Sequence, residues 1–303
     1  MGKTAFLFPG LGALFVGMGR ALYDESPAAR DLFDRAGAIL GFDLKSACFD
    51  GPAGALEATD VSQPAIYVAS LAALADLRMS QPQLVDDCAG AAGLSLGEYT
   101  ALTFAGSLGF EDGLRVVRRR GEAMQAAAMA TPSGMTSILG LDEAKVDELC
   151  RRVGAHGRLW KANMLGTGNI VVSGDSAALA RVEPIAAELG AGRVVALVVA
   201  GAFHSPVMEP AARGLESVFD GVSFGVPRIP VYSNVDTKPH HEPHGIRLSL
   251  VAQVTGGVRW DDSMRRMRAD GFDTFYEIGP GRVLTGLLKR IDRKVPCTSV
   301  PAR

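Results

Sequence analysis

The chain is poor in cysteine and has no excess of charge of either sign. Its four cysteines lie far apart and form no C-x-x-C pair: Cys48, Cys88, Cys150 and Cys297. This spacing argues against a zinc site or a disulfide framework and favours buried thiols in a reducing compartment. The formal net charge is −2, and no basic tract alternates with aromatic residues, which argues against nucleic-acid binding.

Long hydrophobic runs are also absent. Residues 5–19 carry no charge, but Pro9 and several glycines interrupt them, so they do not fit a signal peptide. Residues 194–203 are apolar over about ten positions, far short of the roughly 20 residues that a membrane span needs. We therefore expect a cytoplasmic protein without a membrane segment.

Fingerprints for phosphate and metal binding fail as well. After the apolar run at Lys3–Phe8, a dinucleotide-binding loop would need glycine where Phe15 stands, and a P-loop would need lysine where Met18 stands. Three histidines lie between residues 240 and 244, but the prolines there disfavour a helix that would present them together. We expect neither a cofactor nor a metal.

The most informative motif that is present is G-x-S-x-G at Gly93–Gly97, between a run of small residues and a helix that begins at Glu98. Such a turn holds its serine in a strained conformation, and only glycine at the −2 and +2 positions leaves room for it. The Ser95 hydroxyl would project toward a helix N-terminus, whose N–H groups can hold an oxyanion. A glycine-rich loop with a capping serine is the alternative.

Strand and helix patterns alternate along the chain, which predicts an α/β fold with a parallel sheet. Residues 131–199 follow the order βαββαβ, as in ferredoxin-like domains. We predict a large α/β-hydrolase-like domain from residues 1–130 and 200–303, with the small ferredoxin-like domain inserted. The elements expected in the insertion are strands at Gly134–Leu141, Leu159–Met164, Asn169–Ser173 and Arg193–Val199, and helices at Asp142–Val153 and Ser176–Leu189.

One arginine falls on the apolar side of a predicted helix that runs from about residue 111 to residue 128. Val116, Val117, Arg120 and Met124 share one stripe of this helix. An unpaired guanidinium in the interior would be costly, so an anion should face Arg120. That anion is either a structural carboxylate or a substrate carboxylate held by two parallel hydrogen bonds.

A serine nucleophile needs a base, and the chain has only five histidines. His204 follows the apolar run at residues 198–203 and precedes Ser205 and Pro206, where a buried strand would emerge into a loop. That is the position expected of a catalytic base. A structural histidine is the alternative.

Taken together, these motifs resemble malonyl-CoA:acyl carrier protein transacylases and the related acyltransferase domains of polyketide synthases. Ser95 precedes Arg120 by 25 residues and His204 by 109 residues, as in that family. The resemblance runs along the whole chain. It rests on FPGLG at 8–12, GMG at 17–19, GLSLGEYTAL at 93–102, RGEAMQ at 120–125, AN at 162–163, VSG at 172–174, GAFHS at 201–205, Gln253, VRW at 258–260 and EIGPG at 277–281.

The resemblance implies that Ser95 is the acyl-accepting nucleophile and that His204 is its general base. No aspartate completes a triad in this family; the main-chain carbonyl of the residue matching Gln253 orients the imidazole. The backbone N–H groups of Leu11 and Leu96 would form the oxyanion hole.

By the same resemblance, Arg120 would hold the malonyl carboxylate, and Met124, Asn163 and Phe203 would shape the pocket. A phenylalanine directly before the catalytic histidine resembles malonyl-selective members, since methylmalonyl-selective members usually carry a small residue there. The chain departs from the family at Leu11 and Leu94, where members usually carry glutamine and histidine. We expect Leu94 to pack under the turn.

The implied reaction transfers malonate from malonyl-CoA to the phosphopantetheine thiol of acyl carrier protein through a malonyl-serine, for fatty acid synthesis. We expect a monomer without a cofactor of its own. Alternatives are a stand-alone acyltransferase or an acyl hydrolase serving a polyketide synthase, or an inactive scaffold. Exposed basic residues expected to help dock the acidic carrier are Arg118, Arg119, Lys289, Arg290 and Arg293.

Overall fold

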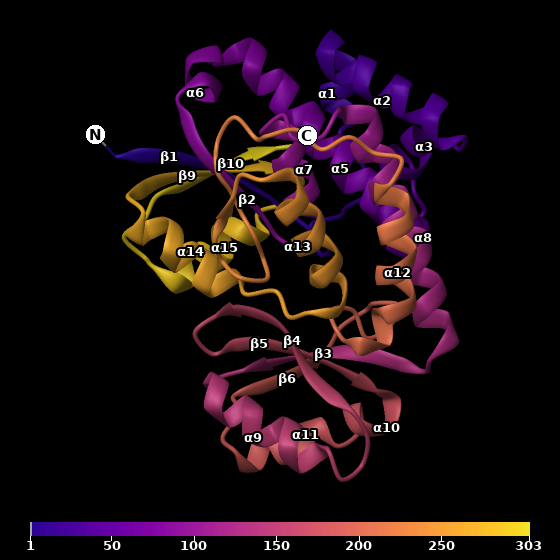
Figure 1. The fold of residues 1–303 in the computed structure, drawn as a ribbon, viewed down its shortest axis with the longest axis vertical. Helices are drawn as coiled ribbons and strands as arrows, with labels where there is room; N and C mark the ends of the chain where they lie inside the picture. Colours follow the sequence, from indigo (N-terminus) through magenta and orange to yellow (C-terminus); the bar gives the residue numbers. More distant parts are fainter. Residues whose placement is uncertain (1) are drawn as a thin grey trace.

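The structure, a computed structural model, describes residues 2–303. Figure 1 shows a larger body built around one sheet and a smaller body built on a second sheet. The larger body takes both the N-terminal and the C-terminal parts of the chain, and the smaller body takes the segment between them. The mixed α/β fold predicted from the sequence is confirmed, with a parallel sheet and a separate small antiparallel sheet.

The large sheet has the strand order β10-β9-β1-β2-β7-β8, and all neighbours are parallel except β7 and β8. Its strands are β1 (Lys3–Phe8), β2 (Cys88–Gly93), β7 (Val231–Tyr232), β8 (Pro239–His240), β9 (Phe272–Gly279) and β10 (Cys297–Pro301). The central strand β1 is apolar on both faces, because helices cover both sides of the sheet. Phe6 and Phe8 join one core, and Ala5 and Leu7 join the other.

The first core lies under α2, α5 and α8, and the second lies under α14 and α15. The helices of this body are α1 (Arg20–Glu25), α2 (Pro27–Leu40), α3 (Leu44–Phe49), α4 (Ala53–Glu57), α5 (Thr59–Ser80), α6 (Pro82–Asp86), α7 (Gly97–Phe104), α8 (Phe110–Ala130), α12 (Glu209–Phe219), α13 (Pro243–Thr255), α14 (Trp260–Ala269) and α15 (Val283–Ile291). The alanine-rich α5 packs against α8, which carries Arg120.

The small sheet is antiparallel, in the order β4-β5-β3-β6. Its elements are β3 (Ser133–Leu139), α9 (Glu143–Val153), β4 (Leu159–Gly166), β5 (Asn169–Asp175), α10 (Ser176–Leu179), α11 (Val182–Glu188) and β6 (Arg193–Ala196). Side chains of β5 alternate between faces: Ile170 and Val172 join a core under α9 and α11, whereas Val171 joins the main core. One face of the small sheet therefore packs on its own helices and the other faces the large body.

Two expectations for the small body are wrong in their bounds. The helix expected at Ser176–Leu189 is interrupted at Ala180–Arg181, because Pro184 has no N–H to bond the carbonyl of Ala180. The strand expected at Arg193–Val199 ends at Ala196, where its pairing with β3 stops. At the start of α9, the Asp142 carboxylate caps the helix by accepting from the N–H of Lys145.

A short β-bridge joins the two bodies beside the site described below. The N–H of Val258 donates to the carbonyl of Ala162 at 2.8 Å, and the N–H of Met164 donates to the carbonyl of Val258 at 2.9 Å. These bonds flank Asn163, which pairs with Val258 across the bridge. The edge of β4 is thereby fixed against the large body, with Asn163 at the junction.

Candidate active site

The turn that carries Ser95 connects β2 to α7 at the carboxyl end of the parallel sheet. Ser95 has a backbone φ of 51°, in the left-handed region that residues other than glycine rarely adopt. A Cβ at Gly93 would overlap the backbone of Gly97, and a Cβ at Gly97 would overlap the carbonyl of Phe8 on β1. The two glycines are thus required because backbone approaches backbone on both sides of the serine.

His204 lies directly against the serine. Its Nε2 is 2.8 Å from the Ser95 Oγ, and its Nδ1 is 2.8 Å from the main-chain oxygen of Gln253. Because a carbonyl oxygen only accepts, Nδ1 carries the proton and Nε2 presents its lone pair to the serine. Burial, reinforced by the charge of Arg120, lowers the pKa of His204 to about 4. The imidazole is therefore neutral at pH 7 and suited to accept the serine proton.

Arg120 is a buried cation beside the same hydroxyl. One of its nitrogens donates to the Ser95 Oγ at 3.1 Å and to the Gln253 Oε1 at 2.9 Å, and the other donates to the Gln63 Oε1 at 2.6 Å. Within residues 2–303, every side chain that accepts from Arg120 is uncharged. The guanidinium also lies over the ring of Tyr99, 5.3 Å from its centroid. The structural carboxylate considered from the sequence is not a direct partner.

Two backbone N–H groups flank the serine turn. The loop after β1 approaches so closely that a Cβ at Gly10 would overlap the carbonyl of Leu94. The next residue in that loop is Leu11, and Leu96 directly follows Ser95. In the described part of the chain, neither of these two N–H groups donates a hydrogen bond. Both are therefore free to donate.

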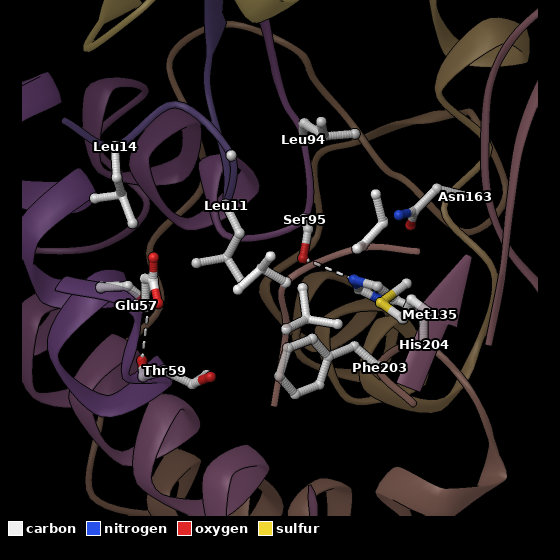
Figure 2. Close-up of a pocket in the computed structure, with 15 residues that line it drawn as sticks. Leu11, Leu14, Glu57, Thr59, Leu94, Ser95, Met135, Asn163, Phe203 and His204 are labelled. Atoms are coloured by element: carbon white, nitrogen blue, oxygen red, sulfur yellow. Dashed lines mark hydrogen bonds between the residues drawn. The ribbon is translucent and has the colours of Figure 1, made fainter. Parts of the chain in front are cut away.

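A cavity of about 360 Å³ opens onto Ser95 and His204. Figure 2 shows the serine hydroxyl pointing toward the imidazole, with Phe203 and Asn163 on the same side and Leu11 across from them. The remaining lining residues are mostly apolar: Gly12, Leu14, Glu57, Thr59, Ser62, Leu94, Met135, Leu197, Val198 and Val199. The space suits a short acyl group attached to a flexible arm.

Known proteins place this arrangement in a family. Residues 5–301 match the family described as acyl transferase domain. The chain belongs to this acyl transferase family. It is 40% identical over 301 residues to the malonyl CoA-acyl carrier protein transacylase of Bacillus subtilis, covering 99% of this chain and 94% of that protein.

Solved structures agree with this assignment. The acyl-carrier-protein S-malonyltransferase of Bartonella henselae has a TM-score of 0.95 to this acyl transferase at 38% identity, covering 98% of this chain and 95% of the other. A malonyl transacylase in complex with a type II polyketide synthase acyl carrier protein has a TM-score of 0.92 at 35% identity, covering 99% and 95% of the two chains.

Not every residue expected at the site of this acyl transferase lines the cavity. Asn163 and Phe203 do, whereas Met124 lies behind Gln63, whose amide nitrogen is 3.6 Å from the Met124 sulfur. Gln253 is fully buried and meets the site through Ser95, His204 and Arg120 rather than at the cavity wall. Met124 and Gln253 are therefore supporting residues.

Leu94 has two roles in the packing of the turn. Its side chain joins the core under α14 and α15, as expected from the sequence, and it also lines the cavity. Leu11 also lines the cavity, beside Ser95. Together the two leucines make the wall around Ser95 apolar, but nothing in the structure explains why both polar residues of the family are replaced.

Three polar residues around the turn were missed by sequence reasoning. The Ser95 N–H donates to the Asn234 Oδ1 at 2.7 Å, and the Asn234 amide nitrogen donates to the carbonyl of Gly93 at 2.8 Å. Glu98 and Gln63 complete the surroundings of Gln253 and Arg120. The only sequence signal was that Glu98 and Gln63 stand among apolar residues of two buried helices.

Across residues 2–303, no three histidine, cysteine or acidic side chains gather as metal ligands would. None of the helices there is long and apolar enough to cross a membrane.

Proposed function

We propose that this acyltransferase moves a malonyl group from malonyl-CoA to the phosphopantetheine thiol of an acyl carrier protein, for fatty acid synthesis. The observation that carries the proposal is Arg120, a buried cation without a direct carboxylate partner, 3.1 Å from the Ser95 hydroxyl. The free carboxylate of malonate would complete its hydrogen bonding by a bidentate pair. The names of the relatives support the same substrate and acceptor.

In the first step, the Ser95 Oγ attacks the thioester carbonyl of malonyl-CoA while its proton passes to the Nε2 of His204. The carbonyl oxygen of the tetrahedral intermediate would accept hydrogen bonds from the N–H groups of Leu11 and Leu96. Collapse of the intermediate breaks the C–S bond, and coenzyme A leaves with the proton from His204. The product is a malonyl ester on Ser95.

In the second step, the same groups act in reverse. The thiol of the carrier gives its proton to His204 and attacks the ester carbonyl, and the serine oxygen leaves with that proton. Atoms and charges balance without a redox change, so the reaction needs no cofactor of its own. Phe203, at the cavity wall next to His204, would disfavour a methyl branch on the acyl group.

A second candidate is a stand-alone acyltransferase that serves a polyketide synthase. The structure of a related transacylase bound to a polyketide synthase acyl carrier protein favours this candidate. An acyl hydrolase is disfavoured, because an apolar acyl group would leave Arg120 without an anion. Competition between fatty acid and polyketide carriers for the same malonyl-enzyme would decide the pathway.

We further propose that the large body is α/β-hydrolase-like and that residues 131–199 form an inserted ferredoxin-like domain. The strained serine turn after a parallel strand supports the first, and the order β4-β5-β3-β6 supports the second. We also propose a cytoplasmic monomer. The four free cysteines fit a reducing compartment.

The decisive experiment mixes the enzyme with malonyl-CoA, quenches it and maps the acyl adduct by mass spectrometry. We expect a malonyl ester on Ser95 that disappears when carrier thiol is added, with malonyl-carrier as the product. Release of free malonate instead would indicate a hydrolase, and the absence of any adduct would indicate an inactive scaffold.

A further inference from the structure

A buried carboxylate that the mechanism above does not use lies beneath the serine turn. Glu98, in the first turn of α7, is 4% exposed. Its Oε2 accepts from the Gln253 Nε2 at 2.7 Å and from the N–H of Asn234 at 3.1 Å. The carboxylate reaches neither Ser95 nor His204 directly, so any effect it has on them passes through its partners.

Gln253 is the junction between Glu98 and the reacting groups. Its main-chain oxygen accepts from the imidazole of His204 at 2.8 Å, and its side-chain oxygen accepts from Arg120 at 2.9 Å. Its side-chain nitrogen donates to the carbonyl of Ser95 at 3.0 Å and to Glu98. One residue thus contacts the nucleophile, the base and the buried cation.

The orientation of the Gln253 amide follows from what faces each end. A carboxylate oxygen accepts hydrogen bonds and a guanidinium only donates them. Glu98 therefore selects the nitrogen end, which leaves the oxygen end for Arg120. The reversed amide would set two donors against each other at Arg120 and two acceptors against each other at Glu98, inside a buried site where such mismatches are costly.

We infer that Glu98 is a positioning residue: it fixes the side-chain amide of Gln253 and, through that amide, holds the main-chain carbonyl of Ser95 and the guanidinium of Arg120. The part of the inference that concerns Arg120 and malonate rests on the proposed function. The part that concerns the Ser95 turn rests on geometry alone. What Glu98 must supply is an acceptor oxygen at this reach, not a charge.

Two substitutions separate reach from charge. E98Q keeps an oxygen at the same reach from Gln253 but cannot ionise, whereas E98D can still ionise but retracts its carboxyl group by one methylene. The first readout is the rate at which a fluorophosphonate, which has no malonyl carboxylate, labels Ser95. The second is the ratio of malonyl to acetyl transfer from the two coenzyme A esters.

We expect E98D to label about a hundred-fold more slowly, since a misplacement on the order of 1 Å costs about that much. Its preference for malonyl over acetyl should also fall, because Arg120 loses a fixed partner. E98Q should keep the wild-type labelling rate and preference. A merely structural role would move stability in both variants without moving the acyl preference.

Glu277 provides a matched control. It is fully buried on β9, and its oxygens accept from the N–H groups of Leu284 and Thr285 at 2.9 and 2.8 Å, away from the cavity. E277D retracts a buried carboxylate in the same way. We expect it to lower stability while the labelling rate and the acyl preference stay at the wild-type level.

The inference is overturned if folded E98D labels as fast as the wild type, or if E98Q loses labelling as E98D does. Should E98D not fold, E98Q decides alone: an unchanged rate and preference support the inference, and a loss of either overturns it. A wild-type enzyme that forms no malonyl adduct would refute the proposed function instead, and fluorophosphonate labelling would still test the positioning of the Ser95 turn.

Discussion

At the scale of single residues, the site is organised around a cation that is incompletely satisfied. Desolvation lowers the pKa of Arg120 from its ordinary value, and the Arg120 Nε has no hydrogen-bond partner among the described residues. Gln63 and Gln253 supply neutral oxygens but no counter-charge. A buried charge held in this way binds an incoming carboxylate more strongly than an exposed one does.

Arg120→Ala should lower kcat/KM for malonyl transfer, because the substrate carboxylate is left buried without a partner. The expected loss of transition-state stabilisation is about 2–5 kcal/mol. Acetyl transfer should be affected less, since acetate carries no such charge. Acylation rates of Ser95 from malonyl-CoA and acetyl-CoA measure the difference. The control is Arg115→Ala on the same helix, since Arg115 is exposed and forms ion pairs with Glu111 and Asp112. Equal losses for both acyl groups would refute the clamp.

The pH dependence of acylation should follow the buried imidazole. Burial lowers the pKa of His204 from 6.5 to about 4, so the base stays neutral and active well below pH 6.5. We expect the acylation rate to fall only as the pH approaches 4. A pre-steady-state pH profile checks this, and an acidic limb near 6.5 would show that the imidazole is solvated.

The same shift makes a prediction for stability. The folded pKa of His204 lies below its unfolded value, so between about 4 and 6.5 the unfolded chain binds more protons than the folded chain. This group therefore removes stability as the pH falls from 6.5 to about 4. Denaturant unfolding of the wild type and of His204→Asn across that pH window isolates the contribution of His204 to the unfolding free energy. The wild type should lose more stability than the variant as the pH falls. Parallel losses in both would contradict the shift.

At the scale of elements, the serine turn depends on the close approach of β1, β2 and α7. Gly97→Ala would place a methyl group on the carbonyl of Phe8, so we expect a loss of about 1–3 kcal/mol in unfolding free energy together with a loss of activity.

Gly286, exposed in the middle of α15, has open space at the position of a Cβ. Gly286→Ala should stabilise by about 0.5–1 kcal/mol without changing activity. Urea titrations compare the two, and a neutral Gly97→Ala would show that the turn can relax.

Periodicity and local signals predict those elements that depend on nearby residues. β1 and α8 follow from apolar runs and stripes, and the strained turn follows from glycines two positions from Ser95. The edge strand β10 was not predicted, because Cys297–Pro301 shows neither alternation nor a continuous apolar run. Residues 297–301 form a strand because they pair in parallel with β9 in the folded protein.

The polar network around Gln253 could not be predicted for a different reason. Glu98 and Gln253 are 155 residues apart in the chain, and Asn234 and Ser95 are 139 apart. Such pairs carry no local signature, so only the folded chain reveals that they meet. The resemblance already indicated the Gln253 carbonyl beside His204, whereas only the fold shows that Glu98, Asn234 and Gln63 surround the reacting groups.

At the scale of the whole molecule, the basic residues expected to dock the carrier do not form one surface. Figure 1 shows α8 and α15 on different sides of the large body. On α8, Arg118 and Arg119 both pair with Glu122, at 2.7 Å each. The helix α15 instead packs against β4, the strand that brings Asn163 to the cavity. Within residues 2–303, none of the ion pairs involves Lys289, Arg290 or Arg293.

We therefore expect the end of α15, and not α8, to attract the acidic carrier. Lys289→Glu combined with Arg290→Glu should raise the apparent KM for the carrier at low salt, and added salt should shrink the effect because it screens exposed charges. The KM for malonyl-CoA in the first half-reaction is an internal control for misfolding. Arg118→Glu combined with Arg119→Glu is the matched pair on α8, and it should leave the carrier KM near the wild-type value. An unchanged carrier KM in the α15 variant, or a larger shift in the α8 variant, would place the docking surface elsewhere on the molecule.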